Sequence, residues 1–153
     1  PLWISEWLKK TFMHMNSKKF SKKIYIDRSD STSNVKHLRT IQNEDEVKNY
    51  LLGIGFDIVR LGEYSFKDQV SIFNNADIIV GLHGAGFANM VFSKPNTKII
   101  ELKKRSHAGK EIENLAKSNN LSYKNLKFES LDTHENQFGH INVPINELKN
   151  NIN

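Results

Sequence analysis

The sequence has no cysteine, so disulfide bonds and thiolate metal sites are excluded. A fold that needs no disulfide suits a reducing compartment, and we expect the protein to be cytoplasmic. Long apolar runs are absent too, because no stretch reaches the roughly 18 consecutive apolar residues of a membrane-spanning helix. An initiator methionine is also lacking, and since the chain begins with Pro1 we expect a fragment or a processed product.

What the sequence does contain is enough for one domain. Its 153 residues are 38% hydrophobic and 25% charged, which suffices for a single buried core. The net charge of +5 indicates an anionic partner, with phosphate, nucleic acid and a membrane surface as candidates. No strand carries an aromatic and basic motif of the kind that binds nucleic acid, so we expect no nucleic-acid partner.

Residues 1–21 are predicted to form an amphipathic helix and a linker, ahead of one domain over residues 22–153. Lysines alternate here with apolar side chains at helical spacing. We favour a docking face for a second domain that this chain lacks. A helix that lies on a membrane surface, which would make the protein peripheral, is the alternative. The apolar residues are Trp3, Ile4, Trp7, Leu8, Phe12 and Met15.

Strands and helices alternate through residues 22–153. Because parallel neighbours need crossover connections, this order predicts an α/β fold: an open parallel-sheet, Rossmann-like domain with helices on both faces. The predicted strands are Lys22–Asp27, Phe56–Leu61, Ala76–Gly81, Thr97–Leu102 and Leu126–Ser130. The predicted helices are Glu44–Leu52, a segment after Ser65, Phe87–Phe92 and Gly109–Asn120. Residues 132–140 are predicted to be a loop, and residues 141–152 a short strand and a terminal helix.

Two helix starts carry capping signals. Asn43 with Glu46 has the pattern of a capping box, and Ser65 with Asp68 marks the start of the next helix. Gly53 stands where a C-terminal cap belongs. We interpret Asn43 mainly as this cap, and contact with a ligand is the alternative.

The stretch from Asp77 to Asn89, DIIVGLHGAGFAN, joins a buried strand to a glycine-rich turn. In open α/β sheets, ligands bind beyond the carboxyl ends of strands, where amides at the next helix start are unpaired. Gly84 and Gly86 lack the Cβ atoms that would keep a ligand from the backbone, and both can adopt positive φ. His83 and Asn89 are further candidate ligand contacts. The alternative is a turn whose glycines serve packing only.

Other chemistries are excluded because their motifs are missing. The turn departs from the dinucleotide fingerprint at Asn89, and no acidic residue follows at the spacing that the fingerprint requires. There is no phosphate-binding P-loop, and HGAG resembles the oxyanion turn of esterases without a G-x-S-x-G nucleophile. The histidines lie too far apart for a helical zinc site, and no D-x-D pattern is present. We therefore expect a site without a metal.

A metal-free site for pyrophosphate must supply positive charge from side chains and amides. Arg28 leaves the first strand at its carboxyl end, and Arg39 precedes the next helix, so both can reach the ligand edge of the sheet. A solvated surface position is the alternative for each. Glu101, expected where its strand emerges, is either an acceptor for ribose hydroxyls or a surface acid.

Taken together, these segments resemble glycosyltransferase family 61. The resemblance covers about Lys22 to Leu102, and more loosely the segment INVPINEL. The HGAG turn within its longer string is the specific part. The matching segments are IYIDR (24–28), RTIQNE (39–44), SFKDQVSIFNNADIIVGLHGAGFANMVF (65–92) and IIEL (99–102). The loop between the two arginines is a few residues longer than the family's usual spacing.

The resemblance implies the C-terminal, donor-binding half of a GT-B enzyme, with the acceptor half missing. It implies inverting, metal-independent transfer from a nucleotide-diphosphate sugar, UDP-linked, to a glycan or glycoconjugate, as in capsular polysaccharide synthesis. Arg28, Arg39 and the amides of Gly84, Ala85 and Gly86 would hold the diphosphate. His83 and Asn89 would position the donor, and Glu101 would contact the ribose or a neighbouring loop. The general base is either His83 or a group in the missing half.

No cofactor is expected, since the nucleotide sugar is a substrate. A protein that binds a nucleotide or a phosphate and catalyses nothing is the alternative function. Without its acceptor half, the chain is expected to be inactive.

Overall fold

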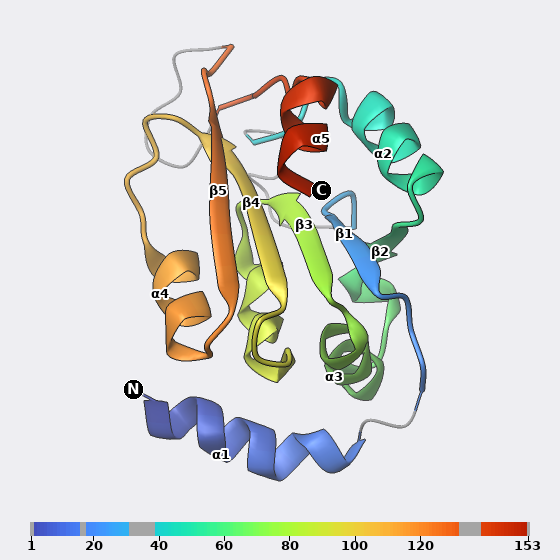
Figure 1. Ribbon diagram of the computed structural model, residues 1–153, viewed down its shortest axis with the longest axis vertical. Coiled ribbons are helices and arrows are strands. Elements are labelled where there is room, and N and C mark those ends of the chain that lie inside the picture. The colour runs from blue at the N-terminus through green and yellow to red at the C-terminus, as the bar shows by residue number, and fades with distance from the viewer. Residues whose placement is uncertain (1, 16–17, 31–38, 132–138, 153) are drawn as a thin grey trace.

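The computed structural model describes residues 2–15, 18–30, 39–131 and 139–152. A five-stranded sheet lies at the centre of the molecule, with strand order β2-β1-β3-β4-β5 and all neighbours parallel. This confirms the prediction of an open parallel-sheet, Rossmann-like α/β domain. The strands are β1 (Lys23–Asp27), β2 (Asp57–Arg60), β3 (Ile78–Leu82), β4 (Lys98–Lys104) and β5 (Ser122–Phe128). In Figure 1 they run upward, so their carboxyl ends share the upper edge of the sheet.

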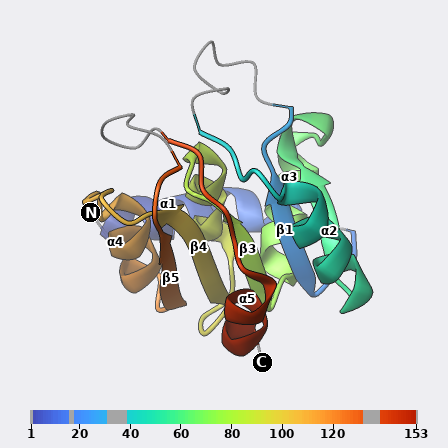
Figure 2. The same ribbon diagram turned by 90° about the horizontal axis from the view of Figure 1, so that it is seen from above.

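Helices cover both faces of this sheet, as Figure 2 shows from above. One core cluster packs α3, α4 and the 3-10 helix η4 against one face, and a second packs α2 and α5 against the other. Side chains alternate between the two clusters along each inner strand, as in β3, where Ile79 belongs to the first and Val80 to the second. These helices are α2 (Glu44–Gly53), α3 (Phe66–Asn75), η4 (Ala85–Phe92), α4 (Glu111–Ser118) and α5 (Ile145–Ile152), with the short 3-10 helix η3 at Leu61–Glu63.

The N-terminal helix is α1 (Leu2–Phe12), continued by the short 3-10 helix η1 (Met13–Met15). It lies below the amino ends of the strands, away from their carboxyl edge (Figure 1). Phe12 makes edge contacts with Phe66 of α3 and Phe92 of η4, at 5.1 and 6.5 Å between ring centroids. Trp3 and Trp7 remain 65% and 54% exposed. One face of the helix is thus packed on the domain through Leu8 and Phe12, while Trp3 and Trp7 lie on the exposed side. No helix in the described ranges is long and apolar enough to cross a membrane.

Several boundaries differ from the prediction by one residue or more. β5 begins at Ser122, four residues before the predicted Leu126, because only its later residues are buried and its start resembles a polar loop. β4 runs two residues beyond Leu102, to Lys104. The predicted strand after the terminal loop is reduced to isolated bridges of Ile141 with Ile41 and Ser130. Most of the predicted loop, residues 132–138, lies outside the described residues.

Candidate functional site

The order of the strands places a switch point between β1 and β3. From this pair the sheet grows in opposite directions, to β2 on one side and to β4 on the other. In open α/β sheets the crevice above such a point is where ligands bind, because the following loops diverge there. Arg28 follows β1 and His83 follows β3, so the sequence-predicted candidates emerge at this crevice.

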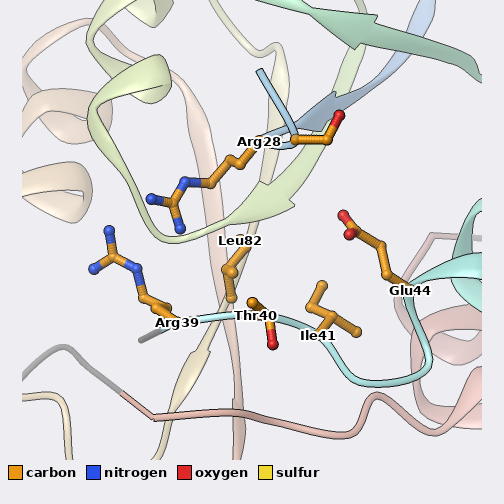
Figure 3. A pocket seen from close by; sticks show the side chains of 7 residues that line it. Arg28, Arg39, Thr40, Ile41, Glu44 and Leu82 are labelled. Atoms are coloured by element: carbon orange, nitrogen blue, oxygen red, sulfur yellow. The ribbon is translucent and has the colours of Figure 1, made fainter. Parts of the chain in front are cut away.

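A cavity of about 290 Å³ lies at this point (Figure 3). Its wall combines cationic, hydroxyl, acidic and apolar groups, so both a phosphate and a hydroxyl-bearing group can find partners. The guanidinium groups of Arg28 and Arg39 lie on the same side of the view, with the carboxylate of Glu44 on the other side. The lining residues are Arg28, Ser29, Arg39, Thr40, Ile41, Glu44 and Leu82.

The two arginines raise the positive potential of this cavity. Burial, and then the nearby charge of Arg28, lower the pKa of Arg39 to about 10. Burial also lowers the pKa of Arg28, although the negative charges of Glu44 and Asp30 oppose the effect. Both groups remain cationic at neutral pH. Since the charge of Arg28 disfavours that of Arg39, an anion placed between them would favour the charged forms.

The turn after β3 is shaped around Arg28. Gly84 has an extended backbone with a φ of 171°, and a Cβ atom there would lie 3.0 Å from Nε of Arg28. Gly86 serves packing, because a Cβ atom there would lie 3.0 Å from Leu61 and 3.2 Å from Ile26. Neither glycine lies in the left-handed region of the backbone map. The turn therefore depends on the missing side chains and not on the backbone freedom of glycine.

The same turn opens the helix η4. Its first in-helix hydrogen bond runs from the amide of Phe87 to the carbonyl of Gly84, at 3.2 Å. The amides of Ala85 and Gly86 precede that bond, so the helix supplies no acceptor for them. They directly follow Gly84, which packs against the Arg28 side chain, and unpaired amides at a helix start are the groups that bind anions.

His83 belongs to a buried polar network. Its amide donates to the carbonyl of Leu102 at 2.9 Å, and its Nδ1 lies 2.5 Å from Oε1 of Glu101. The other carboxylate oxygen of Glu101 accepts from the hydroxyl of Tyr123 and lies 3.3 Å from Nζ of Lys103. Burial raises the pKa of Glu101, but the hydrogen bonds from His83 and Tyr123 and the charge of Lys103 bring it below its ordinary value.

This network corrects the expectation for Glu101. Its side chain is 1% exposed and both of its oxygens are engaged, so it is neither a surface acid nor presented to a ribose. The surface-acid alternative was wrong because β4 continues past Leu102, which leaves Glu101 within the strand. Of the two expected partners, the neighbouring loop is the one it contacts, through His83.

The two asparagines are engaged with protein groups. Asn43 donates 2.9 Å hydrogen bonds to Glu46 and to the carbonyl of Val143, and its own carbonyl accepts from the Val143 amide, also at 2.9 Å. It occupies the N-cap position of α2 without a capping side-chain bond, and it is absent from the cavity wall. Asn89 donates to Oε1 of Gln69 at 2.9 Å, which links η4 to α3.

The sequence analysis assigned no role to three groups at the cavity. Glu44 accepts a 2.8 Å hydrogen bond from the buried Tyr25 hydroxyl, and its carboxylate lines the cavity together with Ser29 and Thr40. The signal for Glu44 and Thr40 was present, because both lie inside the segment RTIQNE that also supplies Arg39.

A C-terminal segment of the chain hydrogen-bonds to the part of the cavity wall that follows Arg39. The amide of Ile141 donates to the Thr40 carbonyl at 3.0 Å, and the Ile141 carbonyl accepts from the Gln42 amide at 2.9 Å. The hydroxyl of Thr40 lies 2.7 Å from Nδ1 of His140. We call residues 139–143, which lie along this wall, the strap. Since about 100 residues separate the partners in sequence, no local pattern indicated this contact.

Together the fold and the cavity define a class of protein: a Rossmann-like α/β domain with a cationic pocket at the switch point of its sheet. Residues 2–100 match the family Glycosyltransferase 61. The chain belongs to this family, which confirms the resemblance seen in its motifs. In the described ranges, no group of three or more histidine, aspartate or glutamate side chains is placed to hold a metal ion.

Individual relatives are similar over shorter stretches. The chain is 30% identical to a "Beta-1,2-xylosyltransferase" of Arabidopsis thaliana over 117 residues, which are 65% of this chain and 22% of the relative. It is 35% identical to an "EGF domain-specific O-linked N-acetylglucosamine transferase" of Mus musculus over 69 residues, 42% of this chain and 13% of the relative. The chain thus spans about a fifth or less of the length of these curated relatives.

Proposed function

We propose that this chain is the donor-binding part of a glycosyltransferase, and that its pocket holds the diphosphate of a nucleotide sugar. One observation carries the proposal: the Arg28 side chain lies against Gly84, on the cavity that Arg39 also lines. Two guanidinium groups next to the first amides of η4 match the charge of two linked phosphates. The membership of family 61 supports a sugar as the group attached to them.

The remaining wall suits the uncharged parts of such a donor. Glu44 can accept hydrogen bonds from ribose or sugar hydroxyls, while Ser29 and Thr40 can donate or accept them. The cavity volume of about 290 Å³ lies at the lower end of the range for small-molecule pockets. We therefore infer that the pocket takes the diphosphate and its immediate neighbours, and that the distal part of the donor extends beyond it.

The reaction that we propose is inverting and independent of a metal. An acceptor hydroxyl attacks the anomeric carbon, and the bond to the diphosphate breaks with its electron pair on the departing oxygen. Arg28 and Arg39 would neutralise the charge that develops there. The names of the relatives favour a donor that carries xylose or N-acetylglucosamine, and we propose a UDP-linked form of either.

The acceptor is proposed to be a glycan or glycoconjugate, bound mainly by a second domain of a GT-B arrangement. The matched segment is only 22% of the plant relative, which leaves room for such a domain in proteins of this kind. A polysaccharide pathway, including one for capsules, is compatible with this proposal.

Donor binding can be tested with the chain itself. Thermal shift and calorimetry with UDP, UDP-xylose, UDP-N-acetylglucosamine and AMP should show binding of UDP compounds that Arg28→Ala and Arg39→Ala weaken. Because one charge-assisted contact contributes about 1.5–3 kcal/mol, the expected loss is roughly 10- to 150-fold in Kd for each. Arg105→Ala is the matched control, since its side chain is 61% exposed and pairs with the exposed Glu129.

Equal affinity of all three variants for UDP would end the proposal. The chain would be a binding protein without catalysis if it took UDP-sugars through the two arginines and no form with an acceptor domain turned them over.

A further inference from the structure

The described residues contain a second chemically active group beside the cavity, the pair His83 and Glu101. We propose that His83 is the general base for the acceptor hydroxyl, and that Glu101 is a positioning residue that fixes which ring nitrogen carries the proton. This inference rests on the proposed donor-binding function, because it assumes a sugar nucleotide at the neighbouring arginines.

The hydrogen bond between the two side chains determines the tautomer. An ionised carboxylate can only accept, so the 2.5 Å contact with Oε1 of Glu101 requires a proton on Nδ1 of His83. Glu101 is held in this role by Tyr123 and Lys103, which occupy its other oxygen. In a neutral His83 the lone pair then lies on Nε2. This arrangement of a buried carboxylate, an oriented imidazole and one open nitrogen is the general solution for an oriented base.

The second nitrogen of His83 is open. Within the described ranges no group hydrogen-bonds to its Nε2, and the side chain keeps 11% of its surface exposed. The imidazole ring of His83 packs against that of His107, at 4.2 Å between the ring centroids. Burial, and then the nearby charges of His83 and Lys103, lower the pKa of His107, so this neighbour stays neutral. A neutral neighbour does not repel the imidazolium that forms when His83 takes up a proton.

The position of the pair relative to the arginines fits the reaction. His83 lies between Leu82, which lines the cavity, and Gly84, which contacts Arg28. The negative charge of Glu101 acts on Arg39 strongly enough to oppose the fall of its pKa. Because side chains alternate along β3, His83 lies on the opposite face of the strand from Leu82. His83 thus neighbours the cavity in the chain without lining it.

The step balances without a further reactant. The proton of the acceptor hydroxyl passes to Nε2 of His83, and the acceptor oxygen forms the bond to the anomeric carbon. The bond from that carbon to the diphosphate oxygen breaks, and its electron pair leaves with the diphosphate beside Arg28 and Arg39. Glu101 remains ionised and pairs with the new imidazolium. General base catalysis of this kind contributes about 100- to 10,000-fold to a rate.

The tautomer can be measured without any turnover. In ¹⁵N-labelled chain, long-range ¹H–¹⁵N spectra should show the neutral form of His83 protonated on Nδ1 only. Glu101→Gln should move the proton to Nε2, because the amide of glutamine can donate to Nδ1. Glu113→Gln is the matched control, since Glu113 pairs only with the exposed Lys117 in the described ranges. A wild-type ring protonated on Nε2 overturns the proposal, as does a Glu101→Gln spectrum unchanged from wild type.

The variant His83→Asn distinguishes a role of His83 as a general base from a role in donor binding. The amide of asparagine can replace Nδ1 as donor to Glu101 but offers no basic nitrogen. We expect UDP affinity within about threefold of wild type, whereas UDP release in the presence of a glycan acceptor, in a form with an acceptor domain, falls at least 100-fold. If His83→Asn loses UDP binding as Arg28→Ala does, His83 is a phosphate ligand and the proposal fails. If no variant alters UDP binding, the proposed function itself fails.

Should Glu101→Gln not fold, Tyr123→Phe provides the second variant. It leaves the bond between His83 and Glu101 in place, so the Nδ1 proton should remain and the rate should fall less than tenfold. A loss as large as that of His83→Asn with the Nδ1 proton still in place would show that the rate does not depend on the tautomer, and the role proposed for Glu101 would fail.

Discussion

Arg28 occupies the space that a side chain on Gly84 would fill. The nearest distances from a Cβ atom on Gly84 are 3.0 Å to Nε and 3.4 Å to Cδ of Arg28. β1 and β3 are neighbours in the sheet, so the residues that follow them meet across the switch point. The glycine in the turn and the arginine after the first strand therefore form one unit, and neither can be changed without effect on the other.

The first prediction concerns this contact. Gly84→Ala should weaken UDP binding about tenfold, or roughly 1.4 kcal/mol, because the new methyl group moves the Arg28 side chain. Stability should change little, since a φ of 171° is accessible to any residue and the displaced group is flexible. Calorimetry with UDP and urea unfolding measure the two effects. A variant that bound UDP normally would show that Arg28 does not hold the phosphates from its observed position.

Gly86→Ala should have the opposite profile. Its methyl group would meet Leu61 at 3.0 Å and the buried Ile26 at 3.2 Å, so it overpacks the core beneath the turn. We expect a loss of about 1–3 kcal/mol in the free energy of unfolding. Gly53→Ala is the control, because nothing lies within 4 Å of its Cβ position. A Gly86→Ala protein as stable as Gly53→Ala would contradict the packing role of this glycine.

Much of this site could be predicted from the sequence, because its residues lie directly after the carboxyl ends of parallel strands. The alternation of elements predicted a parallel sheet, and parallel strands bring the residues after their carboxyl ends together, here Arg28 and Gly84. The surface-acid alternative for Glu101 failed because β4 continues past the predicted end at Leu102. Lysines are rarely buried, so nothing in the sequence indicated that the strand would run on through Lys103. In the structure Lys103 is 3% exposed, and its charge helps to hold Glu101.

The contacts of Asn43 were not predictable from the sequence. Asn43 and Glu46 satisfy a capping pattern and their side chains bond to each other. Asn43 nevertheless makes no side-chain capping bond, and it pairs with the backbone of Val143, 100 residues away. A capping pattern indicates only which hydrogen bonds nearby residues can form. A segment that is distant in the sequence can provide other partners for the same side chain. The strap is such a segment, and it lies beyond residues 2–100 that match the family.

Asp27 gives a prediction for pH. Its side chain is 3% exposed and lies 3.0 Å from Nζ of Lys48. Burial raises the pKa of Asp27, but hydrogen bonds from Ser29 and Lys48 bring it below the usual 3.8. Its folded pKa is therefore below its unfolded pKa, so its contribution to stability is complete above about pH 4 and is lost as the pH falls through the folded pKa.

Asp27→Asn should accordingly cost about 1–3 kcal/mol of unfolding free energy at pH 7, and the difference from wild type should shrink below about pH 4. Urea unfolding of both proteins from pH 3 to pH 7 provides the test. Asp77→Asn is the control, because the ion pair of Asp77 with Lys22 is largely exposed, at 61% and 58%. A difference that stayed constant over this range would mean that the charge of Asp27 does not stabilise the fold.

Variants of Asn89 and Gln69 can show whether Asn89 has a structural role or binds the donor. Gln69 also donates to the carbonyls of Leu61 and Tyr64, at 2.9 and 3.2 Å, so it ties η3 and η4 to α3. Each single alanine variant should lose about 1 kcal/mol of stability, and a double-mutant cycle should give a coupling of roughly 0.5–1.5 kcal/mol. Losses that simply add in the double variant would rule out the bond as a stabilising link. UDP affinity lost in Asn89→Ala but kept in Gln69→Ala would assign Asn89 to the donor.

The strap provides the last prediction, because it holds the segment that carries Arg39. Asn43→Ala removes two hydrogen bonds to Val143, one in each direction, and leaves a buried backbone amide and carbonyl without these partners. Each unpaired group costs about 1–3 kcal/mol, so this variant should be among the most destabilised of the polar substitutions.

UDP affinity should fall as well, since Thr40 and Arg39 would lose the support of Ile141. Asn151→Ala is the control: its side chain bonds only within α5, to the carbonyl of Glu147 in the preceding turn, so both stability and affinity should stay within about 0.5 kcal/mol of wild type. Hydrogen exchange of the Ile141 amide measures the strap directly. Faster exchange in Asn43→Ala, together with weaker UDP binding, would link the C-terminal segment to the pocket, whereas faster exchange with unchanged binding would show that Arg39 is held without it.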